Sequence, residues 1–186
     1  MEPVDPPTLE LEGARLRPLR AGDVAAIHAY LRDPAVTERT SYPAVTEALA
    51  AAIVEKSARR WAAGEPGKWG VVLDGEARVV GTIGFNDSSA AHRSAELAYE
   101  LGRAHWGRGI MRAAVAAVLR WTFERGEVDR VQAFVRVDNL RSQGLLERAG
   151  FVREGRLRSF RVCRGVAHDF FVYGLLRADW RDEAGR

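Results

Sequence analysis

Two glycines separated by one arginine lie in the run His105–Met111 (HWGRGIM), between an expected strand over Ala95–Leu101 and an expected helix from Gly109 to about Arg125. Because glycine has no Cβ, the backbone N–H groups of such a turn can approach a bound group closely. The unpaired N–H groups of the helix that follows, and the positive end of its dipole, favour an anion at the same place. The pattern predicts a phosphate-binding turn and favours a ligand that carries a pyrophosphate.

Glycines before a helix are also common in plain turns, so this pattern alone is a weak signal. Two well-known nucleotide motifs do not fit it. A G-x-G-x-x-G run is absent because Arg112 stands where the third glycine would fall, and the sequence has no glycine-lysine-serine or glycine-lysine-threonine run. Hydride transfer and nucleoside-triphosphate chemistry are therefore poorly supported.

A second polar set follows the next expected strand, Val131–Val137, in the run Asp138-Asn139-Leu140-Arg141-Ser142. Taken alone, Asn139 is typical of the N-cap of a short helix that stops at Gly150, and Ser142 would then be a surface residue of that helix. The order of the two sets adds weight to a functional interpretation. It runs strand, Gly-x-Gly turn, long helix, strand, Asn-x-x-Ser, short helix.

The elements that must position these residues follow from hydrophobic spacing and turn residues. Asp74-Gly75 predicts a hairpin turn, Thr46 is a good N-cap for a helix that stops at Gly64, and a turn near Arg164-Gly165 divides the last two strands. The sequence predicts one α/β domain over residues 13–180, built on a mixed sheet of about seven strands with helices on both faces. Residues 1–12 and 181–186 are expected to be tails. The expected strands cover 14–19, 69–73, 78–85, 95–101, 131–137 and two stretches within 151–176, and the expected helices cover 23–32, 46–64, 109–125 and 139–150.

Composition limits the classes of function. With 186 residues, 47% hydrophobic residues and a net charge of +3, the chain is typical of a soluble globular protein. Its single cysteine, Cys163, excludes an internal disulfide, and an acidic, proline-rich start without a long apolar stretch favours a cytoplasmic protein with no membrane contact. Nucleic-acid binding is not expected, because alternation along a strand would divide the only dense arginine run, over 153–164, between two faces.

The two polar sets in this order resemble the GNAT superfamily of acetyl-CoA-dependent N-acetyltransferases. The run HWGRGIM is most similar to the Rim-type enzymes, which acetylate the N-terminal amine of ribosomal proteins. The broader superfamily pattern, Gln/Arg-x-x-Gly-x-Gly/Ala, is matched strictly only at Gly109, with Trp106 and Met111 at its ends. This departure leaves open whether the Trp106 side chain contacts the cofactor.

The resemblance implies acetyl-CoA as co-substrate and no metal. It implies that the pyrophosphate is bound by the turn, and that the pantetheine arm lies between two splayed parallel strands that end at Leu101 and Val137. A backbone N–H near Leu101 would stabilise the oxyanion, Asn139 would hydrogen-bond the pantetheine, and Ser142 would protonate the departing thiolate. The implied residues of the turn are Trp106, Gly107, Arg108, Gly109, Ile110, Met111 and Arg112.

The attacking amine must lose a proton, and Glu96 and Glu100 are the candidate bases because they share one face of a strand. We expect Glu100, nearer the reaction end, to serve as the base, although one or both glutamates could lie on a solvated face. Asp169 and His168 are weaker candidates. An α-amine with a pKa near 8 costs roughly 1.4 kcal/mol to neutralise at pH 7, against about 4.6 kcal/mol for lysine. Without an unambiguous buried base, an α-amine acceptor is favoured.

Several alternatives stay open at this stage. The acceptor could be a protein N-terminus or a small-molecule amine such as an aminoglycoside, a polyamine or an amino acid, and a bulky lid over Arg39–Pro43 would favour the small amines. A module that binds coenzyme A without turnover is a further alternative. A homodimer through the sheet edge or the final hairpin is compatible with the sequence, which requires none.

Overall fold

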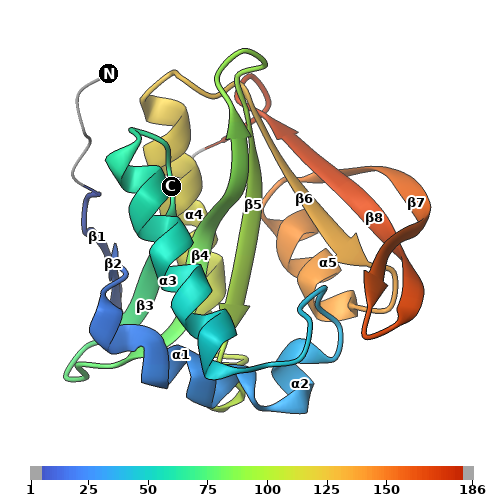
Figure 1. Cartoon of the computed structure of the whole chain (residues 1–186). Helices are drawn as coiled ribbons and strands as arrows, with labels where there is room; N and C mark the ends of the chain where they lie inside the picture. The colour runs from blue at the N-terminus through green and yellow to red at the C-terminus, as the bar shows by residue number, and fades with distance from the viewer. Residues whose placement is uncertain (1–5, 182–186) are drawn as a thin grey trace.

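The structure of the chain is a computed structural model in which residues 6–181 are described. Its centre is a single sheet of eight strands in the order β1-β2-β3-β4-β5-β6-β8-β7 (Figure 1). The strands are β1 (Leu9–Leu11), β2 (Ala14–Pro18), β3 (Lys68–Leu73), β4 (Val79–Ser89), β5 (Ser94–Leu101), β6 (Arg130–Arg136), β7 (Val152–Cys163) and β8 (Val166–Leu176). The helices are η1 (Ala21–Asp23), α1 (Val24–Leu31), α2 (Pro34–Thr37), α3 (Glu47–Ala62), η2 (Arg103–His105), α4 (Ile110–Glu124) and α5 (Leu140–Arg148).

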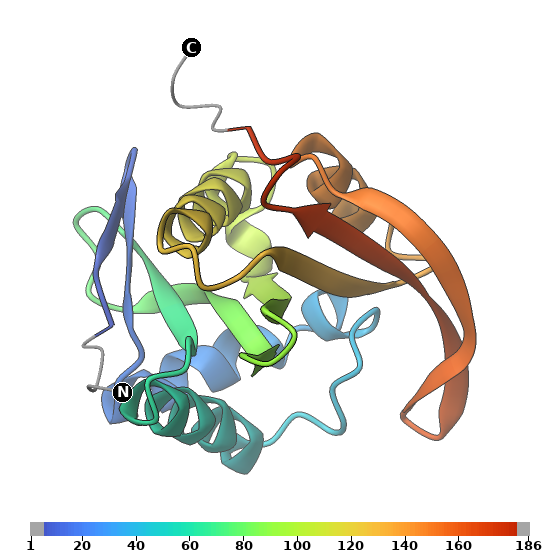
Figure 2. The same ribbon diagram turned by 90° about the horizontal axis from the view of Figure 1, so that it is seen from above.

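The helices cover both faces of the sheet, as the sequence predicts. Seen from above, α1 and α3 lie on one face, while α4 and α5 lie on the other (Figure 2). Two hydrophobic cores result: a larger one that includes Trp69, Val115 and Phe151, and a smaller one under α1 that includes Ile27 and Leu31. The site described below therefore has helices on both sides of its strands.

Local signals in the sequence correctly predict most of these elements. The Asp74-Gly75 turn joins β3 to β4, and Gly75 has a φ of 77°, where glycine is unstrained. The side chain of Thr46 caps α3 by accepting a hydrogen bond of 3.1 Å from the backbone N–H of Leu49. Asp23 precedes α1 but does not cap it with its side chain, because its carboxylate accepts two hydrogen bonds from Arg17 instead.

The first strand is an exception to the expected N-terminal tail. Leu9–Leu11 pair antiparallel with β2, with Leu9 opposite Leu16, and the side chains of Leu9 and Leu11 pack against the larger core. This makes eight strands instead of about seven. A three-residue strand gives too short an alternation to detect in sequence, so the tail expected over residues 1–12 is wrong for this part. Residues 1–5 and 182–186 lie outside the described residues, so those parts of the two predicted tails are untested.

The only parallel contact among the described strands joins β5 to β6, and it is short. It covers Ser94–Glu96 against Arg130–Gln132, whereas β6 goes on pairing with β8 as far as Arg136. Beyond Glu96 the two strands diverge, and Figure 1 shows β5 and β6 separating toward their C-terminal ends. The predicted splay between parallel strands is therefore confirmed.

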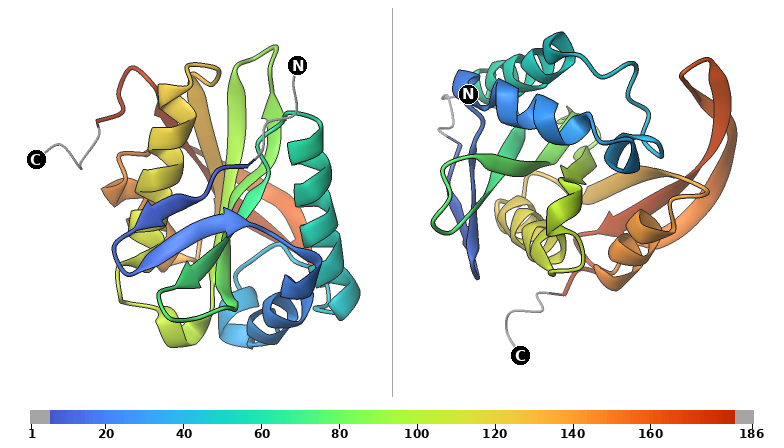
Figure 3. Two further views of the ribbon diagram at one scale, coloured as in Figure 1. Left: turned by 90° about the vertical axis from the view of Figure 1, so that its left-hand side faces the viewer. Right: turned by 90° about the horizontal axis from the view of Figure 1, so that it is seen from below.

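The final hairpin bends away from the sheet (Figure 3, right). The pairing of β7 with β8 shifts between Leu157 and Arg161, where Ser159 has a φ of 49°. The carboxylate of Asp169 holds this bulge by accepting hydrogen bonds from the Ser159 backbone N–H and from Arg156, each 2.8 Å long. The sequence-based expectation that the arginines alternate regularly between the two faces of this strand is therefore wrong. The bulge changes the face toward which the Arg161 side chain points.

Within residues 6–181, no helix combines the length and the apolar character that crossing a membrane requires.

Candidate active site

The glycine turn leaves a row of backbone N–H groups without acceptors. Gly107 and Gly109 have φ values of 75° and 77°, and the first helical hydrogen bond of α4 runs from the N–H of Ala113 to the carbonyl of Gly109. Among the described residues, no hydrogen bond uses the N–H groups from Gly107 to Arg112. A Cβ added at either glycine would meet no atom within 4 Å. No side chain therefore blocks the approach of a ligand to these N–H groups, and the turn fits a diphosphate.

Trp106 has a different part in this turn. Its indole N–H donates to the carbonyl of Leu101 at 2.8 Å, and its backbone N–H donates to Arg103 at 3.2 Å. The guanidinium of Arg141 lies over its ring, 4.3 Å from the centroid. Because both N–H groups of Trp106 have acceptors within the protein, the open row begins at Gly107, one residue later than expected.

The divergence of β5 from β6 leaves one edge of β5 free. The N–H of Gly102 donates to Val80 of β4 at 2.8 Å. Because successive backbone groups of a strand point to opposite edges, and the pairing with β6 ends at Glu96 and Gln132, the N–H groups of Tyr99 and Leu101 point away from β4, toward the gap left by β6. Such an edge can pair with an extended ligand that carries amide groups, as a pantetheine arm does.

A cavity of about 120 Å³ lies at this gap and is lined from both faces of the sheet. Tyr99, Asn139 and Ser142 line it from the side of α4 and α5, and Glu96 and Glu100 line it from the side of α1 and α3. Both residues that the sequence suggests for catalysis, Ser142 and Glu100, therefore reach one cavity.

On the side of α5, Asn139 and Ser142 are held together. The side-chain oxygen of Asn139 caps α5 by accepting a hydrogen bond of 3.3 Å from the Ser142 N–H, which leaves the Asn139 amide group to donate. The Ser142 hydroxyl lies 2.7 Å from the hydroxyl of Tyr99, and burial raises the pKa of Tyr99 above its ordinary value. Sequence reasoning did not single out Tyr99, because only the fold brings β5 next to α5.

On the other side, Glu100 is buried in a polar cluster. The hydroxyls of Thr82 and Tyr42 donate to its Oε1 at 2.6 and 2.8 Å, and the ammonium of Lys68 lies 3.5 Å from the same oxygen. Burial first, and then the charge of Glu100, raise the pKa of Tyr42 and Tyr30 well above the usual value of tyrosine, so both phenols stay protonated. The alternative that Glu100 lies on a solvated face is wrong, since it is only 7% exposed.

The other candidate bases have fixed partners. Glu96 pairs with Arg161 at 3.2 Å and accepts a weaker hydrogen bond from Asn86 at 3.4 Å. Asp169 is occupied in the bulge of β7, where the backbone N–H of Ser159 and then Arg156 lower its pKa. Glu100 is therefore the only one of these three carboxylates without a guanidinium partner among the described residues.

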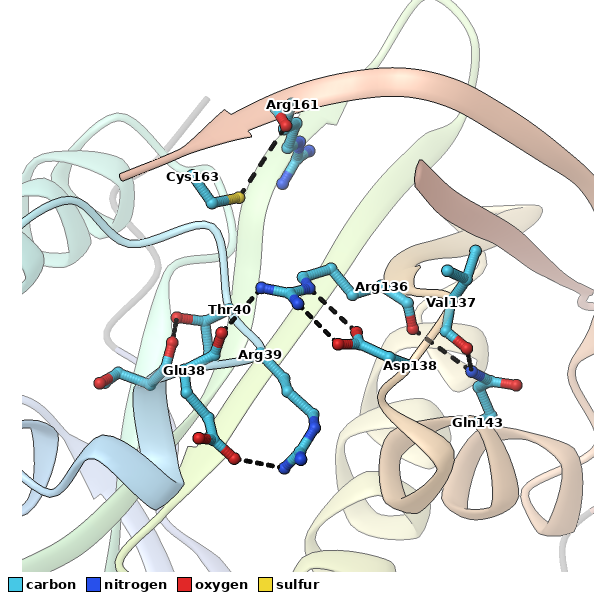
Figure 4. Close-up of polar contacts among 10 residues, drawn as sticks. Glu38, Arg39, Thr40, Arg136, Val137, Asp138, Gln143, Arg161 and Cys163 are labelled. Carbon is cyan, nitrogen blue, oxygen red and sulfur yellow. Dashed lines mark hydrogen bonds and ion pairs between the residues drawn. The ribbon is translucent and has the colours of Figure 1, made fainter. Parts of the chain in front are cut away.

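The segment 39–43, where a bulky lid would favour small amines, borders the cavity, and three arginines hold it and the two residues before it. The guanidinium of Arg136 donates two hydrogen bonds to the carboxylate of Asp138 and a third, 2.7 Å long, to the backbone carbonyl of Glu38 (Figure 4). Arg161 reaches the Ser41 hydroxyl at 3.3 Å, and Arg164 reaches the Thr37 hydroxyl at 3.2 Å. Residues 39–42 line the cavity, so this segment bounds the space beside Glu100.

Comparison with known proteins identifies the family of this fold and site. Residues 14–152 match the family model described as "Acetyltransferase (GNAT) domain". The chain belongs to the GNAT acetyltransferase family. This acetyltransferase is 30% identical over 174 residues to the N-acetyltransferase YoaA of Bacillus subtilis. The match covers 92% of the present chain and 97% of YoaA.

Two relatives with named acceptors match over a shorter stretch. The ribosomal-protein-serine acetyltransferase of Escherichia coli is 32% identical over 54% of this chain and 56% of its own. The spermidine N(1)-acetyltransferase of Vibrio cholerae is 28% identical over 56% of this chain and 55% of its own. The solved structure of RimL in complex with coenzyme A superposes with a TM-score of 0.82 over 91% of this chain and 98% of that one, at 22% identity, which supports the fold.

Proposed function

We propose that this acetyltransferase moves the acetyl group of acetyl-CoA to the N-terminal α-amine of a protein. The observation that carries the proposal is the single cavity that passes from Ser142 on one face of the sheet to Glu100 on the other. Such a cavity lets a thioester enter from the side of α4 and an amine enter from the side of α3. The reaction is expected to take place in the cytoplasm.

The chain has groups that suit the diphosphate, the pantetheine arm and the acetyl group of acetyl-CoA. The N–H groups from Gly107 to Arg112 would hold the diphosphate, and the free edge of β5 together with the amide of Asn139 would hold the pantetheine amides. An N–H at the end of β5, near Leu101, would face the oxygen that gains negative charge. When bound, acetyl-CoA supplies the activated acetyl group and a thiolate leaving group.

Two side chains would move the protons. Glu100 would accept the proton that the ammonium must lose before it can attack, because it is the cavity carboxylate without a guanidinium partner among residues 6–181. Ser142 would donate the proton of its hydroxyl to the departing sulfur and would take up in its place the second proton that the nitrogen loses as the amide forms. The hydrogen bond with Tyr99 supports this role, since a donating phenol leaves the Ser142 proton free to point elsewhere.

Two considerations favour an α-amine as the acceptor. Neutralising an α-amine costs about 3 kcal/mol less at pH 7 than neutralising a lysine side chain, which suits a site with one carboxylate available as base. The likeness to a ribosomal-protein-serine acetyltransferase agrees with an N-terminal acceptor. A small-molecule amine is the second candidate, favoured by the small volume of the cavity, by residues 39–42 that border it, and by the likeness to a spermidine acetyltransferase.

The test is acetylation of a defined panel by the purified full chain. Thiol release from acetyl-CoA would be followed with N-terminal peptides, with the same peptides blocked at the α-amine but carrying a lysine, and with spermidine, an aminoglycoside and free amino acids. We expect release with the free N-termini, with mass spectrometry locating the acetyl group on the α-amine. Acetylation confined to lysines or to small amines would overturn the proposal.

A further inference from the structure

A second and larger cavity continues from the first on the face covered by α3. Its volume is about 530 Å³, and it shares Tyr42, Asn86, Glu96 and Arg161 with the cavity beside Glu100. An acceptor whose amine reaches Glu100 would extend its next groups into this space. The chemistry of its walls should therefore select the acceptor.

Basic side chains outnumber acidic ones along the two cavities. Six basic and three acidic residues line them. All three carboxylates already have a basic neighbour: Glu96 with Arg161 at 3.2 Å, Glu100 with Lys68 at 3.5 Å and Asp87 with Arg60 at 4.0 Å. A polycation would find no carboxylate for its further ammonium groups. The basic residues are Arg39, Lys56, Arg60, Lys68, Arg136 and Arg161.

Lys56 differs from the other five basic residues. Each of the others has a carboxylate partner: Arg39 with Glu38, Arg60 with Glu65, Lys68 with Glu100, Arg136 with Asp138 and Arg161 with Glu96. The side chain of Lys56 makes no ion pair or hydrogen bond with any other described residue, and it is exposed on α3 while lining the larger cavity. Its charge is therefore available to a ligand.

Lys56 is also connected to the polar cluster around Glu100 through its neighbour in the sequence. The next residue, Ser57, exchanges hydrogen bonds of 2.8 Å with the backbone of Lys68, and the Lys68 ammonium reaches Glu100. This link fixes the part of α3 that carries Lys56 relative to the proposed base. An amine at Glu100 and an anion at Lys56 would thus occupy one continuous space.

We infer that the larger cavity is an acceptor subsite for a negatively charged group, and that Lys56 selects acceptors with acidic side chains in the residues after the reactive N-terminus. This inference rests on the proposed function and narrows its substrate class to acidic N-terminal segments. The same residues disfavour a polyamine, because the charge of Lys56 repels a cation and the three cavity carboxylates already have basic neighbours.

The experiment uses three peptides that share their first residue and length and carry Asp, Gln or Lys at positions two to four. For the parent enzyme we expect kcat/KM to be on the order of fivefold higher for the acidic peptide than for the neutral one, and lowest for the basic one. The preference should weaken in 0.5 M salt, which screens an exposed charge. Spermidine should be a poorer acceptor than any of the three peptides.

Charge reversal at Lys56 supplies the decisive comparison. In Lys56→Glu the ratio of kcat/KM for the acidic peptide to that for the basic peptide should fall at least tenfold. The matched control is Arg78→Glu, an exposed reversal before β4 that lines neither cavity, which should keep the parental ratio. Acetylation of all three peptides with the same ratio in the parent and in Lys56→Glu would overturn this inference alone. Failure to acetylate any peptide α-amine would instead overturn the proposed function.

Discussion

The hydroxyl of Tyr99 on β5 lies 2.7 Å from the hydroxyl of Ser142 on α5. Burial raises the pKa of Tyr99, so its phenol keeps its proton and can donate to Ser142. The Ser142 hydroxyl, accepting that bond, is then free to give its own proton to a third group. This pair explains how a serine, a poor acid by itself, could be oriented to protonate a leaving thiolate.

Replacing Ser142 with alanine tests this role. We expect kcat to fall by about 10²-fold or more, the usual contribution of a positioned acid, while the dissociation constant of acetyl-CoA changes little. Steady-state thiol release and calorimetry measure the two quantities. Equal turnover in the variant and the parent would remove Ser142 from the mechanism.

Tyr99→Phe should lower kcat by roughly tenfold, less than Ser142→Ala, because it removes the orienting bond and keeps the acid. The double variant should be no slower than Ser142→Ala, since Tyr99 would act only through the serine. A double variant in which the two losses multiply would show that Tyr99 acts independently.

Glu100→Gln should lower turnover most at neutral pH. An acceptor α-amine with a pKa near 8 is mostly protonated at pH 7 and mostly neutral at pH 9. The loss should therefore be about 10²-fold at pH 7 and should shrink as the pH rises, because the amine then arrives neutral. Glu96→Gln is the comparison, and we expect it to have the smaller effect on kcat. A loss that is the same at both pH values would contradict the assignment of Glu100 as base.

Gly109→Ala should weaken acetyl-CoA binding by about tenfold, because a φ of 77° costs an alanine about 1 kcal/mol and relaxation of the turn would re-aim the open N–H groups. Gly13→Ala is a matched control. Gly13 has a φ of 74°, an added Cβ there meets no atom within 4 Å, and it lies in the turn between β1 and β2. Calorimetry should show unchanged acetyl-CoA affinity for Gly13→Ala, and unchanged affinity for Gly109→Ala would refute the phosphate site.

The buried pair of Arg17 and Asp23 predicts acid sensitivity. Burial alone would raise the pKa of Asp23, but the guanidinium of Arg17 and the backbone N–H of Arg20 lower it below the ordinary value. A lowered pKa in the folded state means that this stabilisation is present above about pH 4 and is lost as the pH falls through the folded-state value. Asp23→Asn should cost about 3 kcal/mol of unfolding free energy at pH 7 by leaving Arg17 buried without its partner.

Denaturant unfolding of the parent and Asp23→Asn at pH 7 and pH 3 measures this contribution. The difference between the two proteins should narrow at pH 3. An equal difference at both pH values would show that the charge of Asp23 does not contribute.

The sequence by itself determined the parts of this protein that depend on near neighbours in the chain. The glycine turn before α4, the Thr46 cap, the hairpin at Asp74-Gly75 and the Asn139 cap each need only a few consecutive residues, because turn conformation and capping are local. The ordered motifs were enough to suggest the family, its cofactor, Ser142 and Glu100.

Only the tertiary structure decided what surrounds those groups. Tyr99 meets Ser142 across 43 residues, and Tyr42 meets Glu100 across 58, so no local pattern could pair them. Arg161 enters the cavity because a bulge in β7 breaks the alternation that a regular strand would have. The charge of the larger cavity also depends on which of its basic side chains form ion pairs with carboxylates. Those ion pairs depend on distances between side chains that exist only after the sheet has formed.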